Sequence, residues 1–129
     1  MKNFKEWGNK KEYIHNQPDQ TIPYFREGEI WWSRLGVNIG FEQDGKNEEF
    51  LRPVLILKKF NQFIFWALPL STKFKNNPYY VECCASDSIQ RTAIISQLRL
   101  ISSKRITTKI TYVKQDSFLS IKKSVKVNL

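Results

Sequence analysis

The sequence predicts one mainly β domain with short helices, folded as a partly closed antiparallel barrel. The chain has 129 residues, the usual length of one domain. Hydrophobic residues make up 41% of it and aromatic residues 14%, enough to form a core. From residue 29 onward, about five to seven short runs rich in β-branched and aromatic residues are separated by polar turns, a pattern typical of small barrels.

An N-terminal extension precedes this pattern. Apolar residues of 3–15 recur at helical spacing, so we expect a short amphipathic helix there. Residues 16–23 are polar and bounded by prolines, as in a linker. The chain therefore divides into an extension, residues 1–24, and a barrel domain, residues 25–129.

The strands are expected where apolar runs meet turn residues. They cover residues 29–35, 53–60, 62–70, 79–85 and 93–101, and a sixth segment, residues 106–113, is expected to mix a turn with a strand. Asn61 marks a tight hairpin, and residues 37–50 form a long polar loop. Most aromatic side chains of the strands are expected in the core, and Phe41, in the long loop, is the exception.

The C-terminal tail has helical periodicity. Phe118, Ile121 and Val125 share one helix face from Ser117 onward. Asp116 or Ser117 can cap the N-terminus of this helix.

Basic residues are in excess: 21 Lys and Arg face 12 Asp and Glu, a formal charge of +9. Residues 99–126 hold eight basic residues and one acidic residue. Such a field attracts polyanions, so a nucleic acid is the favoured partner, although a merely basic surface kept for solubility has the same composition.

The cysteines and the hydropathy indicate a cytoplasmic protein. Cys83 and Cys84 are strand neighbours that point to opposite faces, so we expect one buried and one exposed thiol. No apolar run approaches the roughly 20 residues of a membrane span. We expect no membrane association.

Several kinds of catalytic site are disfavoured. His15 is the only histidine, so a two-histidine nuclease would need a second copy of the chain. His15, Cys83 and Cys84 lack zinc-ligand spacing, and there is no glycine-rich phosphate loop. Acidic residues of the long loop can hold magnesium but are more often solvated: Glu42, Asp44, Glu48 and Glu49. We expect no metal and no cofactor.

RNA cleavage needs neither a metal ion nor a cofactor. RNA carries its own nucleophile, the 2′-hydroxyl, and an arginine fork can hold two phosphate oxygens. Arg52 precedes Pro53 and a fully apolar run, so it stands at the rim of a rigid strand; it can equally pair with Glu48 or Glu49. Ser71 and Thr72 end the next strand, either as a site or as an ordinary hydroxyl turn.

Four sequence elements occur in a fixed order. They are Gly28-Glu29-Ile30-Trp31, Glu42-Gln43-Asp44-Gly45, Arg52-Pro53-Val54-Leu55-Ile56-Leu57 and Pro69-Leu70-Ser71-Thr72-Lys73. In this order the chain resembles the MazF/PemK family of toxins. The resemblance implies an SH3-like barrel of the MazF/CcdB type and a metal-independent endoribonuclease that cuts single-stranded RNA, leaving 2′,3′-cyclic phosphate and 5′-hydroxyl ends. It also implies a homodimer and a cognate antitoxin whose acidic tail covers the basic groove.

The same resemblance assigns residues to roles. It implies that Arg52, Ser71 and Glu42 are catalytic. It implies substrate contacts by Gln43, Thr72, Gln97 and Arg99. The residue types themselves add Lys73 and Lys75 as phosphate contacts and Phe41 as a ring that can stack on an unpaired base. Alternation along 93–101 puts Gln97 and Arg99 on one face, where solvent exposure alone is an equal explanation. The family has threonine where this chain has Ser71, and often glutamine where it has Lys73.

Two other functions remain open on this fold. One is a basic RNA-binding module without catalysis. The other is a CcdB-like poison of DNA gyrase, which would trap gyrase on DNA and leave RNA intact.

Overall fold

The computed structural model describes residues 22–35 and 51–129. The predicted helix at 3–15 and the long loop at 37–50 lie outside these ranges. The described elements are β1 (Glu29–Arg34), β2 (Leu51–Lys59), β3 (Ile64–Ser71), β4 (Tyr80–Cys84), β5 (Gln90–Ile94), the 3-10 helix η2 (Ile95–Gln97), β6 (Arg99–Ser102), the 3-10 helix η3 (Ser103–Arg105), β7 (Ile106–Tyr112) and α2 (Gln115–Val127). Five of the six predicted strands are confirmed to within two residues at either end.

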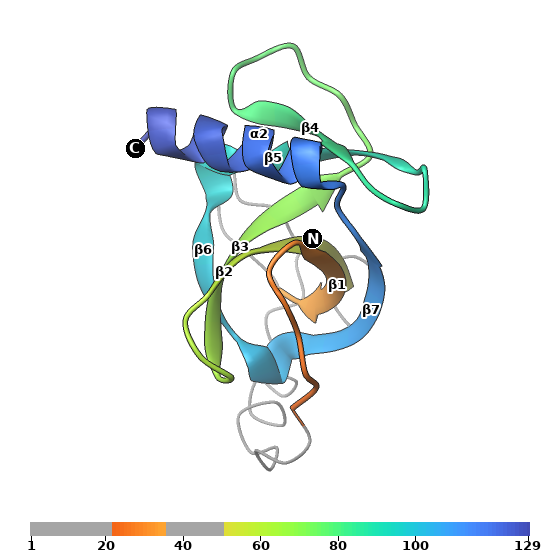
Figure 1. Cartoon of the computed structure of the whole chain (residues 1–129), viewed down its shortest axis with the longest axis vertical. Coiled ribbons are helices and arrows are strands. Elements are labelled where there is room, and N and C mark those ends of the chain that lie inside the picture. The colour runs from red at the N-terminus through yellow and green to blue at the C-terminus, as the bar shows by residue number, and fades with distance from the viewer. Residues whose placement is uncertain (1–21, 36–50) are drawn as a thin grey trace, which may run out of the picture.

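The strands form one antiparallel sheet in the order β4-β5-β3-β2-β1-β7, and β6 also pairs with β3. The sheet curls on itself, and α2 lies across one end of it (Figure 1). An isolated bridge between Ala85 and Val113 brings the two outer ends together without a continuous ladder. The predicted fold class, a mainly β antiparallel sheet that is not fully closed, with a C-terminal helix, is confirmed.

Both faces of β2 are buried, which explains its unbroken apolar run. Val54 and Ile56 face a cluster that includes Phe65 and Ile101. The intervening Leu55 and Leu57 face a second cluster, which α2 covers through Ile121. A strand that is buried on both sides loses the polar alternation of a surface strand. The central strand is therefore a rigid base for the residue at its start.

The hairpin between β2 and β3 is closed by Asn61, as predicted. Its Oδ1 accepts hydrogen bonds from the backbone N–H groups of Phe63, at 2.8 Å, and Ile64, at 3.0 Å. Around this hairpin the expectation for the aromatic residues is only partly right. Phe65 is buried, but Phe63 and Trp66 are 40% and 39% exposed.

The predicted strand at 93–101 is wrong as a single element. Ala93 pairs with Leu70, whereas Ile101 pairs with Phe65. From Ala93 to Ile101 the chain runs eight residues, whereas from Leu70 back to Phe65 its partner β3 runs five. Three residues of 93–101 therefore have no place in a continuous pairing with β3. The 3-10 helix Ile95–Gln97 accommodates them. The apolar pattern alone does not reveal such a change of register.

The C-terminal helix is confirmed, but its predicted cap is not. α2 begins at Gln115, and its N-cap residue Lys114 makes no side-chain capping bond. Ser117 Oγ instead accepts a hydrogen bond at 2.9 Å from the backbone N–H of Cys84. Ser117 therefore fastens α2 to β4, and Asp116 contributes only a favourable negative charge in the first turn.

The two cysteines divide as expected along β4. Cys83 is buried and Cys84 is exposed. Burial raises the pKa of the Cys83 thiol to about 12. Within residues 22–35 and 51–129, no helix has the length and apolar character needed to cross a membrane.

Candidate active site

Arg52 is the second residue of β2 and is only 4% exposed. It lies directly opposite Ser33 of β1, which is fully buried. Opposite residues of an antiparallel pair place their side chains on the same face. The Arg52 side chain therefore lies on the face that β1 and β2 share, near the edge of a packed core. The acidic residues Glu48 and Glu49, its alternative partners, lie outside the described residues.

Strand register brings Arg52 into line with Ser71. Val54 pairs with Pro69 across β2 and β3. Continuing this register by two residues on each strand sets Arg52 opposite Ser71. Ser71 in turn pairs with Thr92 of β5. A row of polar side chains therefore crosses four strands on one face: Ser33, Arg52, Ser71 and Thr92. We call these residues the polar row.

Ser71 ends β3 and is partly exposed. Its Oγ accepts a hydrogen bond from the backbone N–H of Lys73 at 3.1 Å, the hydroxyl turn that the sequence allowed. Thr72, Lys73 and Lys75 follow it and are exposed. The predicted cationic contacts therefore lie beside the polar row, on the segment that leaves it.

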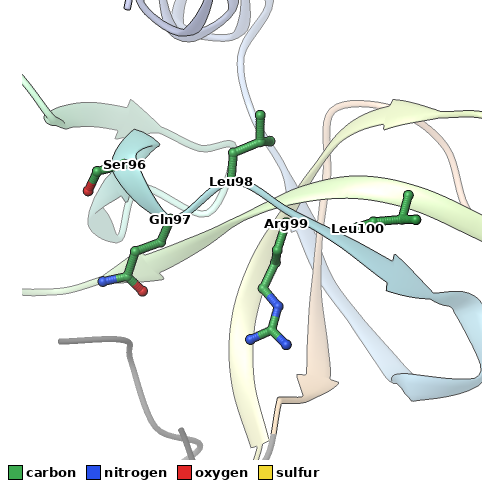
Figure 2. Close-up of a pocket in the computed structure, with 5 residues that line it drawn as sticks. All are labelled: Ser96, Gln97, Leu98, Arg99 and Leu100. Atoms are coloured by element: carbon green, nitrogen blue, oxygen red, sulfur yellow. The ribbon is translucent and has the colours of Figure 1, made fainter. Parts of the chain in front are cut away.

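Arg99 lies on the same face as the polar row. It starts β6 opposite Ala67, which shares a strand face with Ser71 because both are odd-numbered positions of β3. Gln97 belongs to the 3-10 helix, so the alternation argument for it was wrong. Figure 2 nevertheless shows Gln97 and Arg99 pointing to the same side, with Leu98 pointing away. They line a pocket of about 390 Å³ together with Ser96 and Leu100.

Arg105 is a neighbour that the sequence analysis did not select. Its Nη1 donates to the backbone carbonyl of Arg34 at 3.4 Å. Burial, and then the positive charge of Arg99, lower the pKa of its guanidinium. Two arginines thus raise the positive potential near the pocket. In the sequence, the only sign of this pair is that residues 99–105 contain two arginines. The proximity of Arg99 and Arg105 depends on how β6 turns into β7.

The remaining predicted site residues lie outside the described ranges. These are Phe41, Glu42 and Gln43. Among the residues that the structure describes, no three His, Cys, Asp or Glu side chains gather as metal ligands would.

The described residues match phosphate chemistry. A guanidinium can hold two phosphate oxygens, and a neighbouring hydroxyl adds a further donor. Arg99, on the same face, and the exposed lysines that follow Ser71 supply further positive charge. Ser71 is the partly exposed member of the row, so a phosphate would reach the row at the end of β3.

One family model matches the chain over residues 26–129, and it describes the PemK-like, MazF-like toxins of type II toxin–antitoxin systems. The chain belongs to this toxin family. The resemblance read from the sequence is therefore confirmed, and the chain is the toxin component of such a system. No curated protein matches it by sequence.

Solved structures share the toxin's fold at low sequence identity. A MazF from Deinococcus radiodurans is 19% identical, with a TM-score of 0.68, covering 82% of this chain and 97% of that one. A MazE-MazF complex from the same organism is 16% identical, with a TM-score of 0.63, covering 82% of this chain and 96% of that one. An endoribonuclease in complex with its cognate antitoxin, from a mycobacterial species, is 13% identical, with a TM-score of 0.61, covering 81% of this chain and 93% of that one.

Proposed function

We propose that this toxin is a metal-independent endoribonuclease that cleaves single-stranded RNA. The observation that carries the proposal is the β2–β3 register, which sets Arg52 opposite Ser71 when it is continued two residues beyond the pair Val54 and Pro69. Membership of the toxin family and the likeness to a mycobacterial endoribonuclease agree with it. The substrate must be RNA because the reaction uses its 2′-hydroxyl.

The reaction is an intramolecular transesterification. The 2′-oxygen attacks the adjacent phosphorus while its proton passes to a base, and the bond from phosphorus to the 5′-oxygen breaks as that oxygen takes up a proton. The products are a 2′,3′-cyclic phosphate and a 5′-hydroxyl. Negative charge grows on the non-bridging oxygens, so donors fixed in place before the reaction lower its barrier.

Arg52 would hold the non-bridging oxygens, since its side chain is fixed by burial and remains charged at every relevant pH. Ser71 would donate its hydroxyl proton to the same phosphate while its oxygen accepts from Lys73 N. Glu42 is proposed as a third catalytic group on the family resemblance alone. Contacts to the rest of the RNA fall to Phe41, Gln43, Thr72, Lys73, Lys75, Gln97 and Arg99.

Partners follow from the same family. We propose a cognate antitoxin whose acidic segment covers the basic face and blocks RNA, since a charge of +9 suits both ligands. We also propose that the toxin acts as a homodimer in the cytoplasm. The related MazE-MazF complex supports the antitoxin, and molar mass in solution tests the dimer.

The decisive experiment compares two conservative changes in buried arginines. Arg52→Lys keeps the charge but loses the planar fork. Arg91→Lys is the matched control: Arg91 is 6% exposed, and its fork binds both oxygens of Asp87 at 2.9 and 2.8 Å. Because Arg91 adjoins Thr92 on β5, its side chain lies on the other face from the polar row.

We expect the wild type to cut a long unstructured RNA in EDTA and to leave cyclic phosphate ends. Arg52→Lys should lower kcat/KM by about 100-fold or more, the usual loss of a transition-state donor. Arg91→Lys should lose stability rather than activity per folded molecule. Equal activity of the two folded variants would remove Arg52 from the site.

Intact RNA with folded wild type would refute the nuclease. RNA bound without turnover would then indicate a binding module. Cleavage complexes of gyrase on DNA would indicate a CcdB-like poison.

A further inference from the structure

The segment that leaves the polar row is an exposed loop, residues 72–79. It connects β3 to β4 and stands out from the sheet near one end of the molecule (Figure 1). It begins directly after Ser71, so its first residues must lie close to the proposed cleavage site. Three residues span at most about 11 Å, which places Phe74 within that distance of Ser71.

Local hydrogen bonds give this loop a defined shape. Lys73 N donates to Ser71 Oγ at 3.1 Å, which sets the direction in which the loop leaves β3. Asn77 Oδ1 accepts from Tyr79 N at 2.8 Å, and Asn77 N donates to the carbonyl of Lys75 at 3.0 Å. These bonds satisfy backbone groups at both ends of the loop. Its side chains are therefore presented from a shaped turn.

Phe74 projects from this turn with 67% of its surface exposed. Burial of a phenylalanine ring stabilises the folded protein, and this exposed ring contributes little of that stabilisation. Single exposed apolar residues are common and mean little alone. Here the exposed ring lies between two lysines, Lys73 and Lys75, and three residues from Ser71.

Among nucleic acids, single strands with unpaired bases suit an aromatic ring that lies between two cations. Unpaired bases stack on aromatic rings, while lysines bind the phosphates on either side. Lys75 Nζ also lies 5.2 Å from the ring centre of Tyr80, which holds that cation near the start of β4. Paired bases in a duplex are already stacked, so the arrangement selects single strands.

We propose that Phe74 stacks on an unpaired base adjacent to the cleaved phosphate and so helps to choose where the RNA is cut. The inference rests on the proposed nuclease function and extends it to recognition. Phe74 is a positioning residue, since it holds a base and does not touch the reacting atoms. Losing the ring should therefore raise KM more than it lowers kcat.

The test uses an oligonucleotide centred on the cut that wild type makes. A 2′-deoxy sugar at the nucleophile makes it uncleavable, and 2-aminopurine replaces each flanking base in turn. Stacking quenches 2-aminopurine, so wild type should quench it at one position. Phe74→Ala should abolish this quenching and weaken binding about 10-fold. Phe74→Trp should restore both, whereas Phe74→Leu, which is apolar but not aromatic, should not.

The matched control is Phe60→Ala. Phe60 is also exposed, at 43%, and also lies beside a lysine, with Lys58 Nζ 5.7 Å from its ring centre. It lies at the other end of β3, in the turn that leads into that strand. This variant should bind and cut RNA like the wild type.

This design separates failure of the stacking proposal from failure of the proposed nuclease. If wild type cuts RNA but Phe74→Ala keeps its quenching, KM and cleavage pattern, the stacking proposal is refuted and the nuclease stands. If wild type cuts no RNA, the nuclease fails, and this proposal, which rests on it, fails with it. Loss of antitoxin binding in Phe74→Ala, with RNA binding unchanged, would also overturn the proposal.

Discussion

Glu29 shows how one side chain holds two elements together. Its Oε1 accepts from Trp31 Nε1 at 3.0 Å and from Arg26 N at 2.8 Å, and its Oε2 lies 2.9 Å from Lys109 Nζ on β7. Burial raises the pKa of this carboxyl, but its bonds to Lys109, Trp31 and Arg26 together outweigh burial and lower it. The charged carboxylate therefore stabilises the fold where β1 meets β7.

We predict that Glu29→Gln lowers the free energy of unfolding by about 1 kcal/mol near neutral pH, because Lys109 is half exposed and the ion pair is screened. A lowered folded-state pKa gives stability that is present above the ordinary value of 4.5 and is lost as pH falls through the folded value. Urea unfolding of both proteins should therefore converge in acid. A difference that does not change with pH would contradict this role.

At the scale of elements, α2 is the lid of one core cluster. Ile121 is fully buried among residues of β1, β2, β3 and β5, and Phe118 and Val125 pack beside it. Gly28 has a φ of +88° and lies under the Phe118 ring, where a Cβ would come within 3.7 Å of that ring. The helix therefore depends on a few apolar contacts rather than on its N-cap.

We predict that Ile121→Ala costs about 2 to 5 kcal/mol of unfolding free energy, because it leaves a cavity under the helix. Leu119→Ala on the same helix is the control: Leu119 is 55% exposed, and surface changes usually stay within about 0.5 kcal/mol. Chemical denaturation measures both. Equal losses would mean that α2 is not held by this face.

For the whole molecule, cations among the described residues lie on both sides of the sheet. The lysines of α2, such as Lys122, lie on the helix that covers one core cluster, whereas the polar row lies on the opposite face of the strands. Arg99 and Lys73 lie on or beside that polar face. Long-range attraction is shared by all cations, but phosphate contacts belong to those beside the row.

This gives a prediction for binding of an uncleavable single-stranded RNA at several salt concentrations. Each phosphate contact contributes about 0.7 to the slope of log affinity against log salt. Lys73→Gln should reduce the slope by about that amount, whereas Lys122→Gln should change it by less than half as much. Equal effects would show that RNA does not prefer the face of the polar row.

The sequence by itself determined the strands, the Asn61 turn, the C-terminal helix and the family, because these depend on local periodicity, turn chemistry and ordered motifs. It also singled out Arg52 and Ser71 by their places at strand ends. Only the tertiary structure decided that Ser33 and Thr92 join them in one row, that 93–101 breaks at Ile95, and that Arg105 approaches Arg99. The row and the break depend on register between strands distant in sequence, and the approach of the two arginines depends on how β6 turns into β7; no local pattern encodes either.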